Sequence, residues 1–159
     1  MKHLPKHLQP RWRYLAVGIE AWPDADIGRD AFQRGLWYSA QNLLGDAGSA
    51  ALDLSVMGFD YRQGSGEAVV RTHRGSVERA RAVVACLEAV DGEPVGVRVA
   101  GVAGTVQACE EKYMGHRREK TEQRYVAFGG AERSAFHRDG RVDVRTDDAF
   151  AGATTLDIN

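Results

Sequence analysis

The chain has little cysteine, no long apolar run and almost no net charge. Its 159 residues include two cysteines, Cys86 and Cys109, with no Cys-x-x-Cys pair, so a disulfide is not expected and both thiols are predicted to be small buried groups. The apolar runs are too short for a membrane span, and the basic N-terminus lacks the apolar core of an export signal. We therefore predict a cytoplasmic protein with no membrane segment.

The sequence also lacks a recognisable catalytic centre. No serine or histidine fits a nucleophile-elbow or triad pattern. Glu110 and Glu111 are adjacent, so on a helix they point about 100° apart and cannot act as a matched acid and base. His3 and His7 flank a proline and have no third metal ligand near them. We predict no catalytic residue, no metal and no cofactor in this chain.

What is present is an ordered alternation of apolar patterns up to about residue 115. The predicted elements are a strand at 11–19, a helix at 28–45, a hairpin over 52–73, a helix at 75–91, a strand at 95–99 and a helix at 105–114. The order β-α-β-β-α-β predicts an α+β, ferredoxin-like split β-α-β fold. It would have a four-stranded antiparallel sheet and an extra C-terminal helix. The expected domain covers 1–115, and the charged stretch 116–159 is expected to be a disordered tail.

The sheet face opposite the two main helices is predicted to be too apolar to remain bare. It would carry Trp12, Tyr14, Met57 and Phe59, so these four residues are a candidate protein-partner interface. Alternatively, the helix at 105–114 folds back over this face. Thr105 is a suitable N-cap for that helix, and the Gly101–Thr105 turn either binds an anion or is simply a tight connection.

Basic residues are unevenly distributed, although the formal net charge is only −1. Every charged side chain before Glu20 is basic, and further cations lie on or beside the predicted sheet and after it. Cations bind phosphates without reading base sequence, although each one taken singly is more simply a solvated surface charge. The candidates for RNA contact are Lys2, Lys6, Arg11, Arg13, Arg71, Arg74, Arg98, Thr105, Lys112, Arg117 and Arg118. Base stacking in the manner of an RNA recognition motif is not predicted, because the stretch 68–72 contains no aromatic residue.

Three segments in register resemble one known family. They are Arg11-Trp-Arg-Tyr-Leu15, Leu36-Trp-Tyr-Ser-Ala-Gln-Asn-Leu-Leu-Gly45 and Gly101-Val-Ala-Gly-Thr-Val-Gln-Ala-Cys-Glu-Glu-Lys-Tyr113. Together they are similar to the archaeal ribonuclease P protein component 2 family, in the form found in haloarchaea. The resemblance covers about residues 1–115 and leaves the tail outside. Ala103 stands where that family often has serine.

The resemblance implies a non-catalytic subunit of the ribonucleoprotein that removes the 5′ leader from precursor tRNA. In that family the RNA subunit performs the reaction with Mg²⁺. The implied partners are the ribonuclease P RNA, precursor tRNA, the other protein subunits and the TIM-barrel-like component 3, with which this subunit forms a heterotetramer. The alternative that the residues leave open is a ferredoxin-like domain that regulates by binding a small molecule.

Overall fold

The computed structural model describes residues 5–9, 11–115, 122–138, 141–146 and 150–153. The chain divides into an N-terminal unit, Met1–His116, and a C-terminal unit, Arg117–Asn159. The elements of the N-terminal unit are η1 (Lys6–Leu8), β1 (Trp12–Ala21), α1 (Arg29–Leu52), β2 (Ser55–Arg62), β3 (Ser65–His73), η2 (Arg74–Ser76), α2 (Val77–Ala85), β4 (Ala89–Val90), β5 (Glu93–Ala103) and α3 (Val106–Tyr113). The α+β class is confirmed.

The sheet of the N-terminal unit has five strands rather than the predicted four. Its order is β2-β3-β1-β5-β4, and every neighbouring pair is antiparallel. The additional strand is β4, which joins β5 through Asp91 and Gly92. Both turn residues have positive φ, 50° and 79°, as a two-residue hairpin turn of the primed type requires. The Asp-Gly pair at the end of the predicted second helix therefore forms a hairpin instead.

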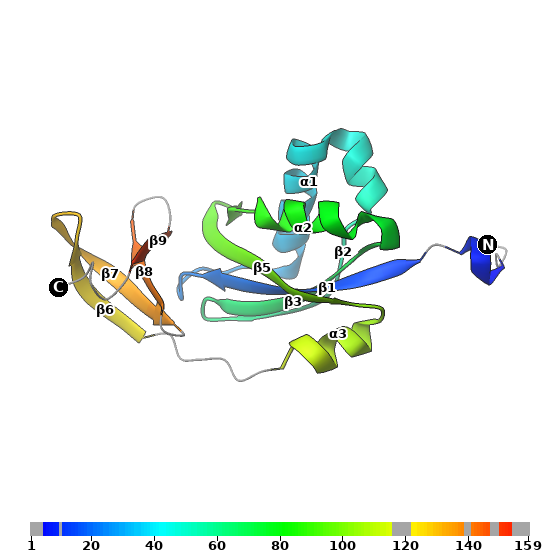
Figure 1. Cartoon of the computed structure of the whole chain (residues 1–159). Helices are drawn as coiled ribbons and strands as arrows, with labels where there is room; N and C mark the ends of the chain where they lie inside the picture. The colour runs from blue at the N-terminus through cyan, green and yellow to red at the C-terminus, as the bar shows by residue number, and fades with distance from the viewer. Residues whose placement is uncertain (1–4, 10, 116–121, 139–140, 147–149, 154–159) are drawn as a thin grey trace. The chain divides into compact units, whose positions relative to one another are not determined.

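Helices α1 and α2 cover one face of this sheet, and α3 lies on the other (Figure 1). Phe32, Leu36 and Ala40 of the predicted stripe are fully buried, which confirms the core face of α1. Leu43 belongs to the same predicted stripe but is 45% exposed. The cause is close by, because Gly45 has φ 75° and ψ 177° and bends the helix before it resumes toward Leu52.

The second sheet face is covered by α3, one of the two predicted possibilities. Ala16 and Val69 of the sheet are buried against Cys109 of α3, and Tyr14 and Tyr113 pack around them. The Thr105 hydroxyl accepts a hydrogen bond from the Ala108 amide at 3.0 Å, so the predicted N-cap is confirmed.

Two β-bulges change which side chains face which layer. In β2 the register shifts between Val56 and Gly58, and the ring of Phe59 consequently lies 5.6 Å from that of Phe32 in α1. The prediction that Phe59 faces away from the two main helices is therefore wrong. In β5 the shift leaves Ala100 without a partner on β1, since Val99 pairs with Val17 and Gly101 with Ala16.

The two cysteines differ in environment. Cys109 is fully buried, and its thiol lies 3.8 Å from the Tyr14 carbonyl oxygen, to which it donates. Burial, and then the neighbouring Glu110 carboxylate, raise the pKa of the Cys109 thiol. Cys86 follows the last residue of α2 and is exposed, so its predicted burial is wrong.

The C-terminal unit contains an antiparallel sheet in place of the predicted disordered tail. Its strands, in the order β6-β7-β8-β9, are β6 (Glu122–Phe128), β7 (Ala131–Arg138), β8 (Arg141–Arg145) and β9 (Phe150–Ala153). Val126, Ala135, Val142 and Val144 form its core. The alternation is short and interrupted by charged residues, which is why it does not stand out in the sequence. Within the described residues, no helix has both the length and the apolar character that crossing a membrane requires.

Candidate nucleic-acid interface

Four of the predicted RNA-binding arginines gather at one end of the five-stranded sheet. There β1 begins and its antiparallel neighbour β3 ends (Figure 1). The register pairs Trp12 with His73, and the Arg74 amide donates to the Arg11 carbonyl at 2.9 Å. We call Arg11, Arg13, Arg71 and Arg74 the basic cluster. The backbone pairing of two strands, rather than flexible loops, positions these residues.

An aromatic stack lies within the basic cluster. The Trp12 and His73 rings have centroids 4.3 Å apart and planes 19° from parallel. The Arg71 guanidinium carbon lies 4.0 Å from the centroid of the Trp12 ring, which is a cation–π contact. Arg71 Nε is buried and has no hydrogen-bond partner among the described residues. The Arg71 guanidinium is therefore oriented by its contact with the Trp12 ring and not by a hydrogen bond at Nε.

One carboxylate stands close to the stack. Asp53, which ends α1 in a left-handed conformation, places Oδ2 4.0 Å from His73 Nε2. The cluster itself contributes four positive charges, against one negative charge of Asp53. A positive surface of this kind attracts a polyanion through its phosphates without reading base sequence.

The other predicted RNA-binding residues lie apart from the basic cluster. Lys6 is in η1, Arg98 is opposite Gly18 on β5, and Lys112 is on α3 with its ammonium 5.3 Å from the Tyr113 ring centroid. The Thr105 hydroxyl acts as the helix cap. Lys2, Arg117 and Arg118 lie outside the described residues. The predicted Gly101–Thr105 turn is shorter than expected, because β5 continues to Ala103. No feature of this segment singles out a ligand, and the small-molecule alternative gains no support.

The four residues of the predicted partner interface do not form one surface. Trp12 belongs to the aromatic stack, Tyr14 packs beside α3, and Phe59 faces α1. Met57 is 38% exposed. Helix α3 covers the sheet face on which the sequence analysis placed a candidate partner interface.

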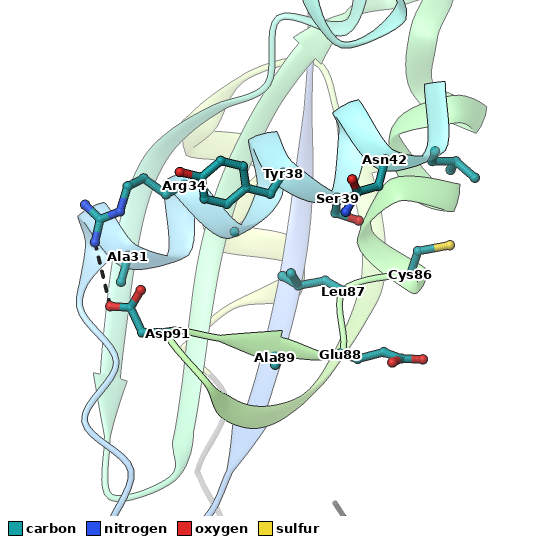
Figure 2. Close-up of a pocket in the computed structure, with 12 residues that line it drawn as sticks. Ala31, Arg34, Tyr38, Ser39, Asn42, Cys86, Leu87, Glu88, Ala89 and Asp91 are labelled. Atoms are coloured by element: carbon teal, nitrogen blue, oxygen red, sulfur yellow. Dashed lines mark ion pairs between the residues drawn. The ribbon is translucent and has the colours of Figure 1, made fainter. Parts of the chain in front are cut away.

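A second apolar surface, which the sequence patterns did not predict, lies on the outside of α1. Trp37, Tyr38 and Leu43 are 47%, 62% and 45% exposed, and we call them the α1 outer surface. Two cavities of about 520 Å³ adjoin it and share Arg34 and Tyr38. Figure 2 shows the first cavity, where Arg34 pairs with Asp91 at 3.7 Å. Trp37 and Tyr38 directly follow the buried Leu36. Because successive residues of a helix point in different directions, the sequence already indicated that these two side chains could not both face the core.

Around the α1 outer surface the charge is mainly acidic. The carboxylates that line the two cavities are Asp46, Asp53, Glu88 and Asp91. Arg34 is their one basic lining residue. This rim disfavours RNA and contrasts with the basic cluster. The N-terminal unit thus has one surface suited to phosphates and another suited to an apolar protein partner.

Comparisons with known proteins agree on one family. The model of the Rpp14/Pop5 family matches residues 13–114. The ribonuclease P protein component 2 of Natronomonas pharaonis is 63% identical over 158 residues, covering 99% of this chain and 98% of the relative. That of Haloarcula marismortui is 60% identical over 160 aligned positions, covering 99% of this chain and 99% of the relative. Both matches extend through the C-terminal unit, beyond the expected limit at 115.

More distant matches cover less of the chain. The ribonuclease P protein component 2 of Methanosarcina mazei is 31% identical over 114 residues, which is 72% of this chain and 93% of the relative. Among solved structures, a chain in the cryo-EM structure of yeast ribonuclease MRP superposes with a TM-score of 0.50 at 15% identity. The superposition covers 61% of this chain and 76% of that one. At this identity the superposition indicates a shared fold alone.

Proposed function

Because the chain belongs to the Rpp14/Pop5 family, we propose that it is a non-catalytic protein subunit of ribonuclease P. In this proposal it binds and stabilises the RNA that removes the 5′ leader from precursor tRNA. The single observation that carries the proposal is the match of nearly the whole chain to relatives named ribonuclease P protein component 2. The basic cluster supports it, because guanidinium groups are suited to contacts with phosphates.

The proposed mechanism is electrostatic rather than chemical. Guanidinium groups at the sheet end neutralise neighbouring RNA phosphates, which would otherwise repel each other as the RNA compacts. Arginine suits this role because its planar group offers several donors to phosphate oxygens. The RNA subunit and its Mg²⁺ ions would perform the hydrolysis, and this chain would lower the ion concentration at which the RNA is active.

Reconstitution tests the function directly. Ribonuclease P RNA and component 3 would be assembled with or without this chain, and precursor tRNA cleavage would be measured across a range of magnesium concentrations. We expect faster cleavage at low magnesium when the chain is present. An unchanged rate at every magnesium concentration would contradict the proposed function.

Replacing Arg11 and Arg13 together with alanine should weaken RNA binding. The plot of log affinity against log salt concentration should become shallower by about 0.7 to 0.9 for each phosphate that the variant no longer neutralises. A matched control is Arg34→Ala with Arg62→Ala, because both arginines have exposed side chains and lie outside the basic cluster. Filter binding at several salt concentrations gives the slope. If both double variants show the same reduction in slope, the basic cluster is not the binding surface.

We also propose that this subunit pairs with component 3. The α1 outer surface supports a protein contact, since three large apolar side chains are grouped there beside open cavities. Changing Tyr38 to alanine and Leu43 to glutamate should abolish co-elution with component 3 in gel filtration. The control is Tyr125→Ala, which removes a 71% exposed aromatic residue from the C-terminal unit. Retention of the complex by the Tyr38 and Leu43 variant would exclude this surface.

A further inference from the structure

The aromatic stack is partly exposed to solvent and lies among the arginines of the basic cluster. One face of the His73 imidazole lies on Trp12, yet 37% of the His73 side chain remains exposed. Helix α3 packs on Ala16, further along β1, and its buried contacts do not include Trp12 or His73. The imidazole is therefore partly accessible from solvent.

Cationic residues adjoin the stack in the sequence and through strand pairing. Arg11 and Arg13 flank Trp12 in the sequence, and Arg74 follows His73. The Arg71 guanidinium, which lies 4.0 Å from the centroid of the Trp12 ring, is the cation placed directly at the stack, and Arg11 and Arg74 join the two strands beside it. Proteins that bind single-stranded nucleic acid commonly combine aromatic platforms with basic residues in this way.

The stack is also ordered before any ligand arrives. Arg71 lies over the Trp12 ring, and Asp53 lies at the Nε2 edge of His73. The contact with Arg71 restricts the Trp12 ring, so part of the side-chain freedom is already lost before a further ring adds to the stack. A purely structural role would not require the pair to lie at the end of the two strands with the imidazole partly exposed.

We propose that the Trp12–His73 stack is a binding site for an unpaired nucleobase, which stacks on the face of His73 opposite Trp12. The site deepens the proposed function and rests on it, because the base would belong to RNA held by the basic cluster. Bases inside an A-form helix are already stacked on each other and are not accessible to such a platform. The ligand is therefore a single-stranded, bulged or terminal nucleotide rather than a duplex.

The test compares two short RNA probes on the full-length chain. One is an octamer of adenosine nucleotides, and the other is an abasic ribose-phosphate octamer of equal charge. The wild-type protein should bind the adenosine octamer at least about fivefold more tightly, because stacking one base contributes a factor of roughly 5 to 150. His73→Ala should remove this preference while the affinity for the abasic octamer and its salt dependence stay unchanged.

Two further variants separate stacking from loss of structure. His73→Phe restores a flat ring and should restore the preference, whereas Tyr125→Ala, a distant exposed aromatic, should leave it unchanged. Equal binding of the two octamers by the wild-type protein would overturn the stacking site but leave phosphate binding intact. Retention of the preference in His73→Ala would also overturn it. Failure to bind either octamer would count against the stacking site and the proposed function together.

Discussion

Replacement of Phe32 with alanine is expected to lower the free energy of unfolding of the N-terminal unit by about 3 to 5 kcal/mol. Phe32 is fully buried in α1, and its ring lies 5.6 Å from that of Phe59 in β2. Truncation removes the apolar contact between helix and sheet and leaves a cavity that close-packed neighbours can only partly fill. Since small domains are stable by about 5 to 15 kcal/mol, the decrease is a large fraction of the total.

Chemical denaturation followed by far-ultraviolet circular dichroism would measure this decrease. Tyr38→Ala serves as a control on the same helix, because Tyr38 is 62% exposed and its removal should change stability by no more than about 0.5 kcal/mol. Similar decreases for the two variants would contradict the assignment of Phe32 to the core and of Tyr38 to the surface.

Gly101→Ala is expected to destabilise the contact between α3 and the sheet by about 1 to 3 kcal/mol. A Cβ at Gly101 would clash directly with the ring carbons of Tyr113. The ring would have to leave its place beside Tyr14 and Ala16, which would expose part of the face that α3 covers. Position 101 needs glycine because a Cβ would not fit under the Tyr113 ring, and not because the backbone there adopts a conformation that only glycine allows.

A double-mutant cycle isolates that requirement. In a Tyr113→Ala background the added methyl group meets no ring, so Gly101→Ala should cost far less there than in the wild-type chain. Gly104→Ala is the matched control, since nothing lies within 4 Å of a Cβ at that position. Equal costs of Gly101→Ala in both backgrounds, measured by denaturation, would show that the ring contact does not determine the choice of glycine.

Local patterns predicted much of the N-terminal unit. Leu15, Val17 and Ile19 alternate on a strand, and all three are buried, because period two directly reflects strand geometry. The Thr105 cap was also predictable, since its partner amide is three residues away. The ferredoxin-like interpretation stays a prediction, because the fifth strand departs from the expected four-stranded sheet.

Features that depend on distant neighbours were not predictable. Phe59 was assigned to the wrong face because a bulge in β2 depends on its pairing with β3. The arginines were identified singly, but their clustering depends on the register that puts Trp12 opposite His73. The stack depends on the same register, because Trp12 and the strand-terminal His73 form it together and no aromatic residue within 68–72 takes part.

The bulge in β5 lets one strand serve both layers of the N-terminal unit. Before it, Val97 and Val99 lie opposite Ile19 and Val17, on the α1 and α2 side. After it, Gly101 lies opposite Ala16, beneath α3. A regular strand of the same sequence would place Ala100 opposite Ala16, and a methyl group would then occupy the space that the Tyr113 ring needs. The unpaired Ala100 therefore determines which residue of β5 lies under the Tyr113 ring. Deleting a residue here would disturb the contact with α3 as a larger side chain at position 101 would.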